Sequence, residues 1–172
     1  DLETLRMDGP IGLGGTVDLG DERVAEVELS GRMAGRRIVL DRVEGAVLGG
    51  KLAGEGVADL DQPLNSDLLM ISEGLSLSRL KQFVPELGEL EGKVDLTFEL
   101  AHTTDPRAPA PMKGMLALKG HDAAWRELTL LAGEAETYLV PADGAARGQR
   151  WADRLLLKRS AWQFGQGALD VW

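Results

Sequence analysis

An alternation of apolar and polar residues between Leu90 and Leu100 places the strongest constraint on the fold. Apolar residues or glycine occupy every even position of this stretch, and charged or polar residues occupy every odd position from Glu91 to Glu99. Successive side chains of a β-strand point to opposite faces of the sheet, whereas a helix would spread the same residues around its circumference. The stretch therefore predicts a strand with one apolar face and one solvated face.

The same alternation recurs along the chain, often directly after a glycine. We expect further strands of this kind at residues 11–19, 25–29, 52–60, 114–118 and 169–171. The glycine-led strand starts, from Gly15 to Gly167, are irregularly spaced. A meander of hairpins is therefore expected, because a solenoid would require a fixed repeat.

Two segments depart from this alternation. Ser78 is a suitable N-cap for a short helix that runs to Val84 and ends before Pro85. A second helical or irregular region is expected from about Gly144 to Lys158, where apolar residues occur at mixed spacings. Residues rich in proline or typical of turns predict loops at 60–67, 102–111 and 141–144.

Together these patterns predict a mainly all-β fold with one or two short helices. Amphipathic strands can form a curled antiparallel sheet with a β-groove, or they can pack as a sandwich of two sheets. The 22 glycines favour many turns and bends. No stretch has the composition of a long flexible linker. We therefore predict one β-rich domain over residues 1–172, or a segment of a longer repetitive β-sheet protein.

Charge and composition disfavour several functional classes. A formal net charge of −9 is opposite in sign to that of a nucleic-acid-binding surface, so no nucleic-acid partner is expected. The chain has no cysteine, which excludes disulfides, zinc–thiolate sites and iron–sulfur clusters. No apolar stretch approaches the ~20 residues of a membrane span.

The candidate catalytic residues are few. His102 and His121 flank a proline-rich loop and a glycine turn, and we interpret them as exposed turn residues rather than as a base or metal ligands. Two pairs of carboxylates have i, i+2 spacing and are expected to share a solvated strand face: Asp59 with Asp61, and Glu134 with Glu136.

Two further motifs also lack the context that catalysis or phosphate binding needs. Ser72 is followed by Glu73 and Gly74, which is not a nucleophile elbow. The glycines at 12, 14 and 15 lead into an alternating strand, whereas a phosphate loop leads into a helix. We expect no enzymatic activity, no cofactor and no metal.

Several of these stretches together resemble AsmA-like proteins. The resemblance lies in Val47–Leu60, in Leu75–Phe83 followed by Leu90–Leu96, and in Met112–Leu118. In that family a short helix precedes a glycine-started strand, and the next strand begins with another glycine after a loop. The match covers about residues 10–120 well and the remainder loosely. The type II secretion protein N family is similar in its strand pattern and is a close rival.

The resemblance implies a periplasmic, non-catalytic envelope domain in Gram-negative bacteria. AsmA-like proteins, with their TamB-like and YdbH-like relatives, form long curled sheets whose groove is lined by apolar side chains. The resemblance further implies a role in phospholipid transport between membranes or in outer-membrane homeostasis. It also implies tethering to the inner membrane by a segment absent from this sequence. The expected groove lining, in contact with phospholipid or another acyl-chain ligand, is Val17, Leu19, Leu52, Val94, Leu96, Phe98, Leu116 and Leu118.

Two alternatives remain open at this point. The same apolar residues are equally compatible with a closed core, in which case the domain is a structural or assembly component such as a secretion-system accessory protein. The final strand, which begins at Leu169, has no further strand to pair with in this sequence. We therefore expect edge-strand pairing with another copy or with other envelope proteins, because an unpaired edge is a template for a further strand.

Overall fold

The computed structural model describes residues 7–19, 22–62, 65–80, 89–140 and 154–171. These residues form ten β-strands and one short helix. The elements are β1 (Met7–Leu19), β2 (Glu22–Gly35), β3 (Arg37–Val47), β4 (Gly50–Asp59), β5 (Asp67–Ser76), α1 (Leu77–Leu80), β6 (Leu90–His102), β7 (Met112–Trp125), β8 (Leu128–Val140), β9 (Arg154–Phe164) and β10 (Gly167–Val171).

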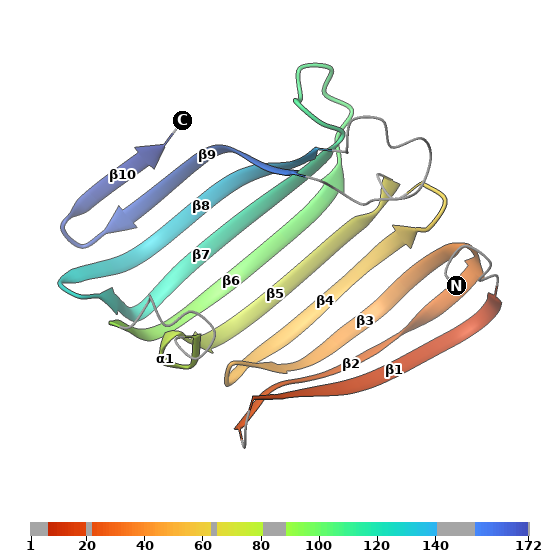
Figure 1. Cartoon of the computed structure of the whole chain (residues 1–172), viewed down its shortest axis with the longest axis horizontal. Coiled ribbons are helices and arrows are strands. Elements are labelled where there is room, and N and C mark those ends of the chain that lie inside the picture. Colours follow the sequence, from red (N-terminus) through yellow and green to blue (C-terminus); the bar gives the residue numbers. More distant parts are fainter. Residues whose placement is uncertain (1–6, 20–21, 63–64, 81–88, 141–153, 172) are drawn as a thin grey trace.

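All ten strands belong to one antiparallel sheet in which spatial order follows sequence order. Each strand pairs with its neighbours in the chain, from β1 at one edge to β10 at the other. The sheet is curled but does not close on itself (Figure 1). The prediction of a mainly all-β, curled antiparallel sheet is confirmed, and the sandwich is not formed by the described strands.

Strand register separates the side chains into two faces. Residues directly opposite one another on paired strands share a face, so the apolar residues of successive strands line up across the sheet. We call the resulting surface the apolar face. Its large side chains include those of Leu13, Val17, Leu29, Val43, Leu52, Met70, Leu96, Phe98, Leu116, Leu118, Trp162 and Leu169.

The opposite surface, which we call the polar face, carries most of the charged residues of the strands. Its members include Glu28, Glu44, Lys51, Glu73, Asp95, Thr97, Ala117, Lys119, Glu134 and Gln163. The paired carboxylates Glu134 and Glu136 lie here as expected, on β8. Asp59 ends β4 and Asp61 lies in the following loop, so this second pair does not share a strand.

Glycines on the apolar face allow large neighbours to lie flat on the sheet. A Cβ at Gly54 would collide with the Met70 sulfur, and a Cβ at Gly133 would collide with the indole of Trp162. Both contacts are between directly paired residues. The frequent glycines therefore serve side-chain packing as well as turns.

The helix α1 covers one end of the apolar face (Figure 1). Leu77 packs with Val94 and Ala123 in a closed cluster, and Leu90 and Leu130 contribute partly buried side chains to it. Burial of this small cluster is the main stabilising contribution that a four-residue helix can make.

The helix begins earlier than the sequence predicted, at Leu77. Ser78 is the second helical residue rather than the N-cap, and its hydroxyl shares a hydrogen bond of 2.8 Å with that of Ser76. The expected continuation to Val84 lies outside the described residues.

Four strands were not anticipated from the alternation: β3, β5, β8 and β9. The region from Gly144 to Lys158 was expected to be helical or irregular, and this was wrong for Arg154–Lys158, which belongs to β9. The remainder of that region, including the expected turn at 141–144, lies outside the described residues. The expected loops at 60–67 and 102–111 are present between β4 and β5 and between β6 and β7.

Candidate functional site

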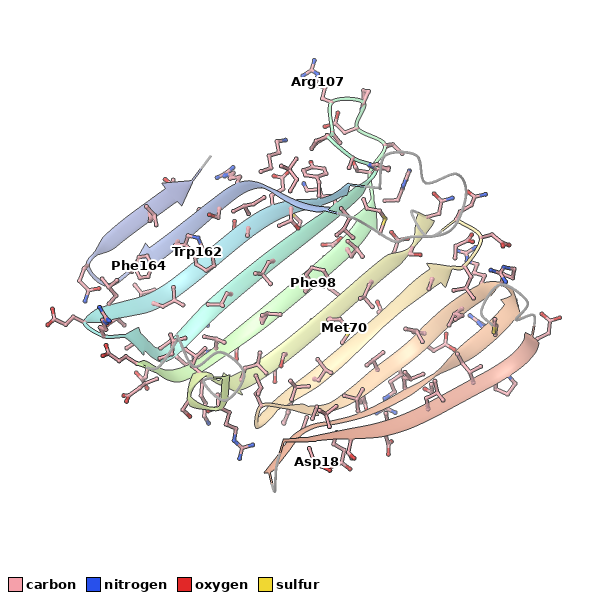
Figure 2. All side chains as sticks on the ribbon, in the orientation of Figure 1. Asp18, Met70, Phe98, Arg107, Trp162 and Phe164 are labelled. Atoms are coloured by element: carbon pink, nitrogen blue, oxygen red, sulfur yellow. The ribbon has the colours of Figure 1, made fainter. Side chains whose placement is uncertain are left out.

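The apolar face brings together the residues expected to line a groove. Phe98 lies opposite Met70 on one side and Leu116 on the other. Leu96 and Leu118 form the next pair of the same face. Figure 2 shows Met70 and Phe98 over the middle strands and Trp162 toward the β10 edge. Leu52 and Val17 extend the face toward β1, while the side chain of Leu19 lies outside the described residues.

Exposure of the apolar face rises from the centre of the sheet to its edges. Leu96, Phe98, Leu116 and Leu118 are half-buried by their neighbours. At the β1 edge Leu13 is 66% exposed. At the β10 edge Leu169 is 53% exposed. No second sheet formed by the described residues covers this face. A continuous apolar surface of this extent is typical of an interaction site rather than of a finished monomer surface.

Val94 does not line the open part of this face as expected. It is 3% exposed and lies beneath Leu77 in the closed cluster under α1. Leu118 packs against the rim of the same cluster. The short helix therefore turns one end of the expected groove lining into core.

One polar side chain on the apolar face has its hydrogen bond satisfied internally. Ser72 occupies the position between Leu52 and Leu96. Its hydroxyl is buried and donates to the backbone carbonyl of Lys51 at 2.7 Å. Because this bond satisfies the hydroxyl donor, Ser72 places no unpaired buried donor on the apolar face.

A polar contact on the opposite face links three neighbouring strands. His121 Nε2 lies 2.5 Å from Asp95 Oδ2, and the other carboxylate oxygen accepts a hydrogen bond of 2.8 Å from the Gly74 N–H. The hydrogen bond from His121, and then that from Gly74, holds the pKa of Asp95 below its ordinary value. The expectation that His121 lies at a turn was wrong, because it lies within β7.

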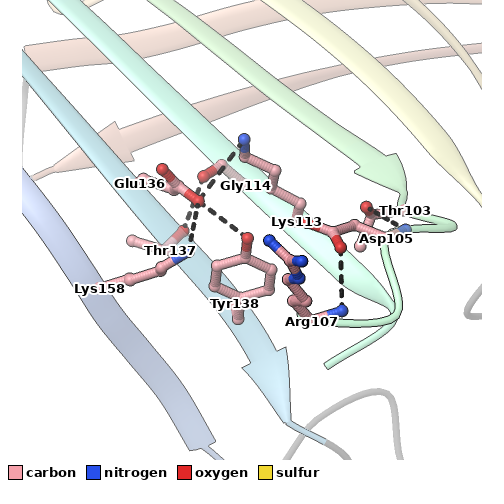
Figure 3. A network of polar contacts seen from close by, with 9 residues as sticks. All are labelled: Thr103, Asp105, Arg107, Lys113, Gly114, Glu136, Thr137, Tyr138 and Lys158. Carbon is pink, nitrogen blue, oxygen red and sulfur yellow. Dashed lines mark hydrogen bonds and ion pairs between the residues drawn. The ribbon is translucent and has the colours of Figure 1, made fainter. Parts of the chain in front are cut away.

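A second polar cluster surrounds Tyr138 beside the loop at 103–111 (Figure 3). The Tyr138 hydroxyl donates to Glu136 Oε1 at 2.8 Å. Lys113 Nζ and Lys158 Nζ lie 3.5 and 3.7 Å from the same oxygen. Lys158 Nζ also lies 5.6 Å from the centre of the Tyr138 ring, a cation–π distance.

The surroundings of this cluster shift the pKa of Glu136 and the pKa of Tyr138 in opposite directions. The hydrogen bond from Tyr138 and the two lysines lower the pKa of Glu136, against the opposing effect of burial. Burial and the neighbouring carboxylate raise the pKa of Tyr138 to about 12. The two shifts favour a protonated phenol beside an ionised carboxylate, and this pairing keeps the hydrogen bond between Tyr138 and Glu136.

The remaining candidate carboxylates and His102 hold local structure. Asp59 Oδ1 accepts backbone hydrogen bonds from Asp61 and Gln62, and Asp61 pairs with Arg36, so these carboxylates organise the loop after β4. His102 ends β6, where its N–H donates to Asp67. No group of three potential metal-ligating side chains occurs among the described residues.

Some members of the apolar face were missed by the sequence analysis. Leu13 belongs to the same alternation as Val17 and could have been found from it. Met70 and Leu157 lie in continuous apolar runs, where an alternation of period two cannot be read and the face is not assigned.

A hollow of about 660 Å³ between β8, β9 and β10 is lined in part by Trp162, Phe164 and Asp170.

The described residues include no helix with the length and hydropathy of a membrane span. No family model, no curated protein sequence and no solved structure matches this chain.

Proposed function

We propose that this chain is a non-catalytic domain of a bacterial cell envelope that binds or conducts lipid acyl chains along its apolar face. It acts in the periplasm, tethered to the inner membrane, in phospholipid transport between membranes or in outer-membrane homeostasis. The supporting observation is the apolar face, which crosses ten strands and, apart from the end under α1, has no covering layer among the described residues. Binding of acyl chains to such a surface is favourable, because contact removes apolar area of both the chains and the protein from water.

The two faces of β6 and β7 allow a matched test. Phe98 and Leu116 are directly opposite on the apolar face, and Thr97 and Ala117 are directly opposite on the polar face one residue away. The double variants Phe98→Asp/Leu116→Asp and Thr97→Asp/Ala117→Asp add the same charge to the same strands. Native mass spectrometry of protein purified from a bacterial envelope, and binding of a fluorescent phospholipid in vitro, report lipid occupancy.

We expect lipid to co-purify with the unmodified chain and with the polar-face variant, and to be lost from the apolar-face variant. Far-UV circular dichroism checks that each protein remains folded. If the apolar-face variant unfolds, Leu13→Asp/Val17→Asp at the exposed edge replaces it, since neither side chain is buried there. Lipid-free wild-type protein, or equal loss from both double variants, contradicts the proposal.

A second candidate function is supported by the sheet edges. The exposed apolar side chains of β1 and β10, including Leu13 and Leu169, suit a structural or assembly component such as a secretion-system accessory protein. Such a component would bind its partners through strand edges and would carry no lipid. Loss of complex formation in edge variants that remain lipid-free distinguishes it from the lipid-binding domain.

A further inference from the structure

We propose that two copies of this chain pair through β1, antiparallel and centred on Gly14, to form one continuous sheet. The proposal concerns the edge of the sheet and does not depend on whether a lipid occupies the apolar face. Within the described sheet β1 is hydrogen-bonded to β2 on one side and to no strand on the other.

The exposed edge of β1 lacks the usual protection against strand addition. Residues 11–17 form a seven-residue run without a charged side chain, bounded by Pro10 and by the register shift after Val17. Natural edge strands are normally shortened, charged or interrupted by bulges and proline, because their free backbone groups otherwise recruit another strand. Here Pro10 precedes the segment, and the extra residue at the register shift, Val24, belongs to β2, so the interior of the segment is left open.

Side-chain packing on β1 is incomplete in a specific way. Two inner glycines of the apolar face lie beneath a large side chain: Gly54 beneath Met70 and Gly133 beneath Trp162. Gly15 lies on the same face, on β1, but no atom of the described residues lies within 4 Å of the place that its Cβ would take. Two residues away, Leu13 is 66% exposed. On the free side of β1, no large side chain covers Gly15, and the side chain of Leu13 has no glycine to pack over.

A second copy of β1 supplies the missing packing on both sides. When two β1 strands pair about Gly14, Leu13 of each copy lies opposite Gly15 of the other. Ile11 lies opposite Val17, and Gly12 lies opposite Thr16. A two-fold axis perpendicular to the sheet relates the copies, so both apolar faces remain on the same side. No like charges meet within the run, since it has none.

The other edge is less suited to the same pairing. β10 carries a charged side chain, Asp170, on its polar face, whereas residues 11–17 of β1 carry none. We therefore assign the self-association to β1.

The absence of cysteine permits a direct test by single-site cross-linking. In the proposed register the two Gly14 residues face each other at a Cα separation of about 4.5–5.5 Å, within disulfide range. The two Gly12 residues are four strand positions apart, or about 14 Å. Both glycines are exposed on the polar face, and a Cβ added to either would have no neighbouring atom closer than 3.8 Å, so both accept a cysteine.

We expect Gly14→Cys to form a disulfide-linked dimer at least tenfold faster than Gly12→Cys under mild oxidation. Sedimentation of the wild-type chain should show a concentration-dependent dimer. Gly14→Asp, which places two carboxylates opposite each other, should abolish the dimer, and Ala168→Asp on β10 should leave it intact. Equal cross-linking of the two cysteine variants, or a strictly monomeric wild-type chain at its highest attainable concentration, overturns the proposal.

Discussion

The indole of Trp162 lies directly over Gly133, its partner on the neighbouring strand β8. A methyl group at Gly133 would overlap the six-membered ring, so the indole must move or the strands must separate. We expect Gly133→Ala to lower the free energy of unfolding by about 1–3 kcal/mol, the usual cost of overpacking. Urea denaturation followed by tryptophan fluorescence measures the change.

The control for this substitution is Gly12→Ala on β1. The nearest atom to a Cβ there, the Leu29 carbonyl oxygen, is 4.0 Å away. The unfolded-state entropy changes equally in both variants, because both replace glycine by alanine. If Gly133→Ala and Gly12→Ala had the same free energy of unfolding, the packing of the Trp162 ring would not require a glycine at position 133.

Leu77 should contribute far more to stability than its four-residue helix suggests. It is 7% exposed and closes the cluster that contains Val94 and Ala123. Leu77→Ala should lower the free energy of unfolding by about 2–5 kcal/mol, because it leaves a cavity in a packed cluster. Leu131→Ala removes the same atoms from a side chain that is 42% exposed. Urea denaturation should show a much smaller loss for this control, and a similar loss would mean that α1 does not seal the cluster.

The hydroxyl of Tyr138 should ionise at a higher pH in the folded protein than in the unfolded chain. Its pKa is raised to about 12 from an ordinary value of 10.0, so the folded state holds this proton more tightly than the unfolded state. The resulting stabilisation is complete below pH 10 and is lost as the pH rises from 10 toward 12. Tyr138 is the single tyrosine of the chain, so absorbance of the phenolate near 295 nm reports it alone.

Tyr138→Phe provides the matching measurement. It removes the hydrogen bond to Glu136 and should cost about 1.5–3 kcal/mol near neutral pH, the range for a bond to a charged acceptor. The variant should lack the part of the stability loss between pH 10 and 12 that the tyrosine causes. A phenolate transition near pH 10 in the folded wild type would contradict the burial-based assignment.

Asp95 should stabilise the fold at neutral pH and cease to do so in acid. Its pKa lies below the ordinary value of 3.8, chiefly because of the hydrogen bond with His121. The contribution is therefore present above about pH 4 and is lost as the pH falls through the lowered pKa. Urea denaturation from pH 6 to pH 2 should show Asp95→Asn less stable than wild type at the upper end, with the difference shrinking in acid. Asp170→Asn, at an exposed residue of β10, is the control and should show no such convergence.

Strand prediction succeeded where one face of a strand is apolar and the ladder is regular. The alternation from Leu90 to Leu100 predicted β6 nearly to its ends. Prediction failed at β5, where Leu69 and Ile71 place apolar side chains on the polar face as well. A run that is apolar on both faces has no period, so sequence alone does not identify it as a strand.

Bulges explain much of the remaining failure. The register of β3 shifts between Leu40 and Val43, and that of β9 shifts against β8 at Glu136/Thr137. Each extra residue reverses the inside–outside order of the positions that follow it. Local alternation identified the apolar face strand by strand, but the covering of Val94 by α1 and the pairing of His121 with Asp95 depend on contacts across strands.

The sequential strand order has a mechanical consequence. Because every strand is hydrogen-bonded to its chain neighbours alone, the sheet is a one-dimensional stack without long crossover connections. A force that pulls the two ends apart would peel strands off the edges one after another, rather than shear the whole sheet at once. Rupture should therefore occur in a series of small steps, each releasing the contour length of one strand or hairpin.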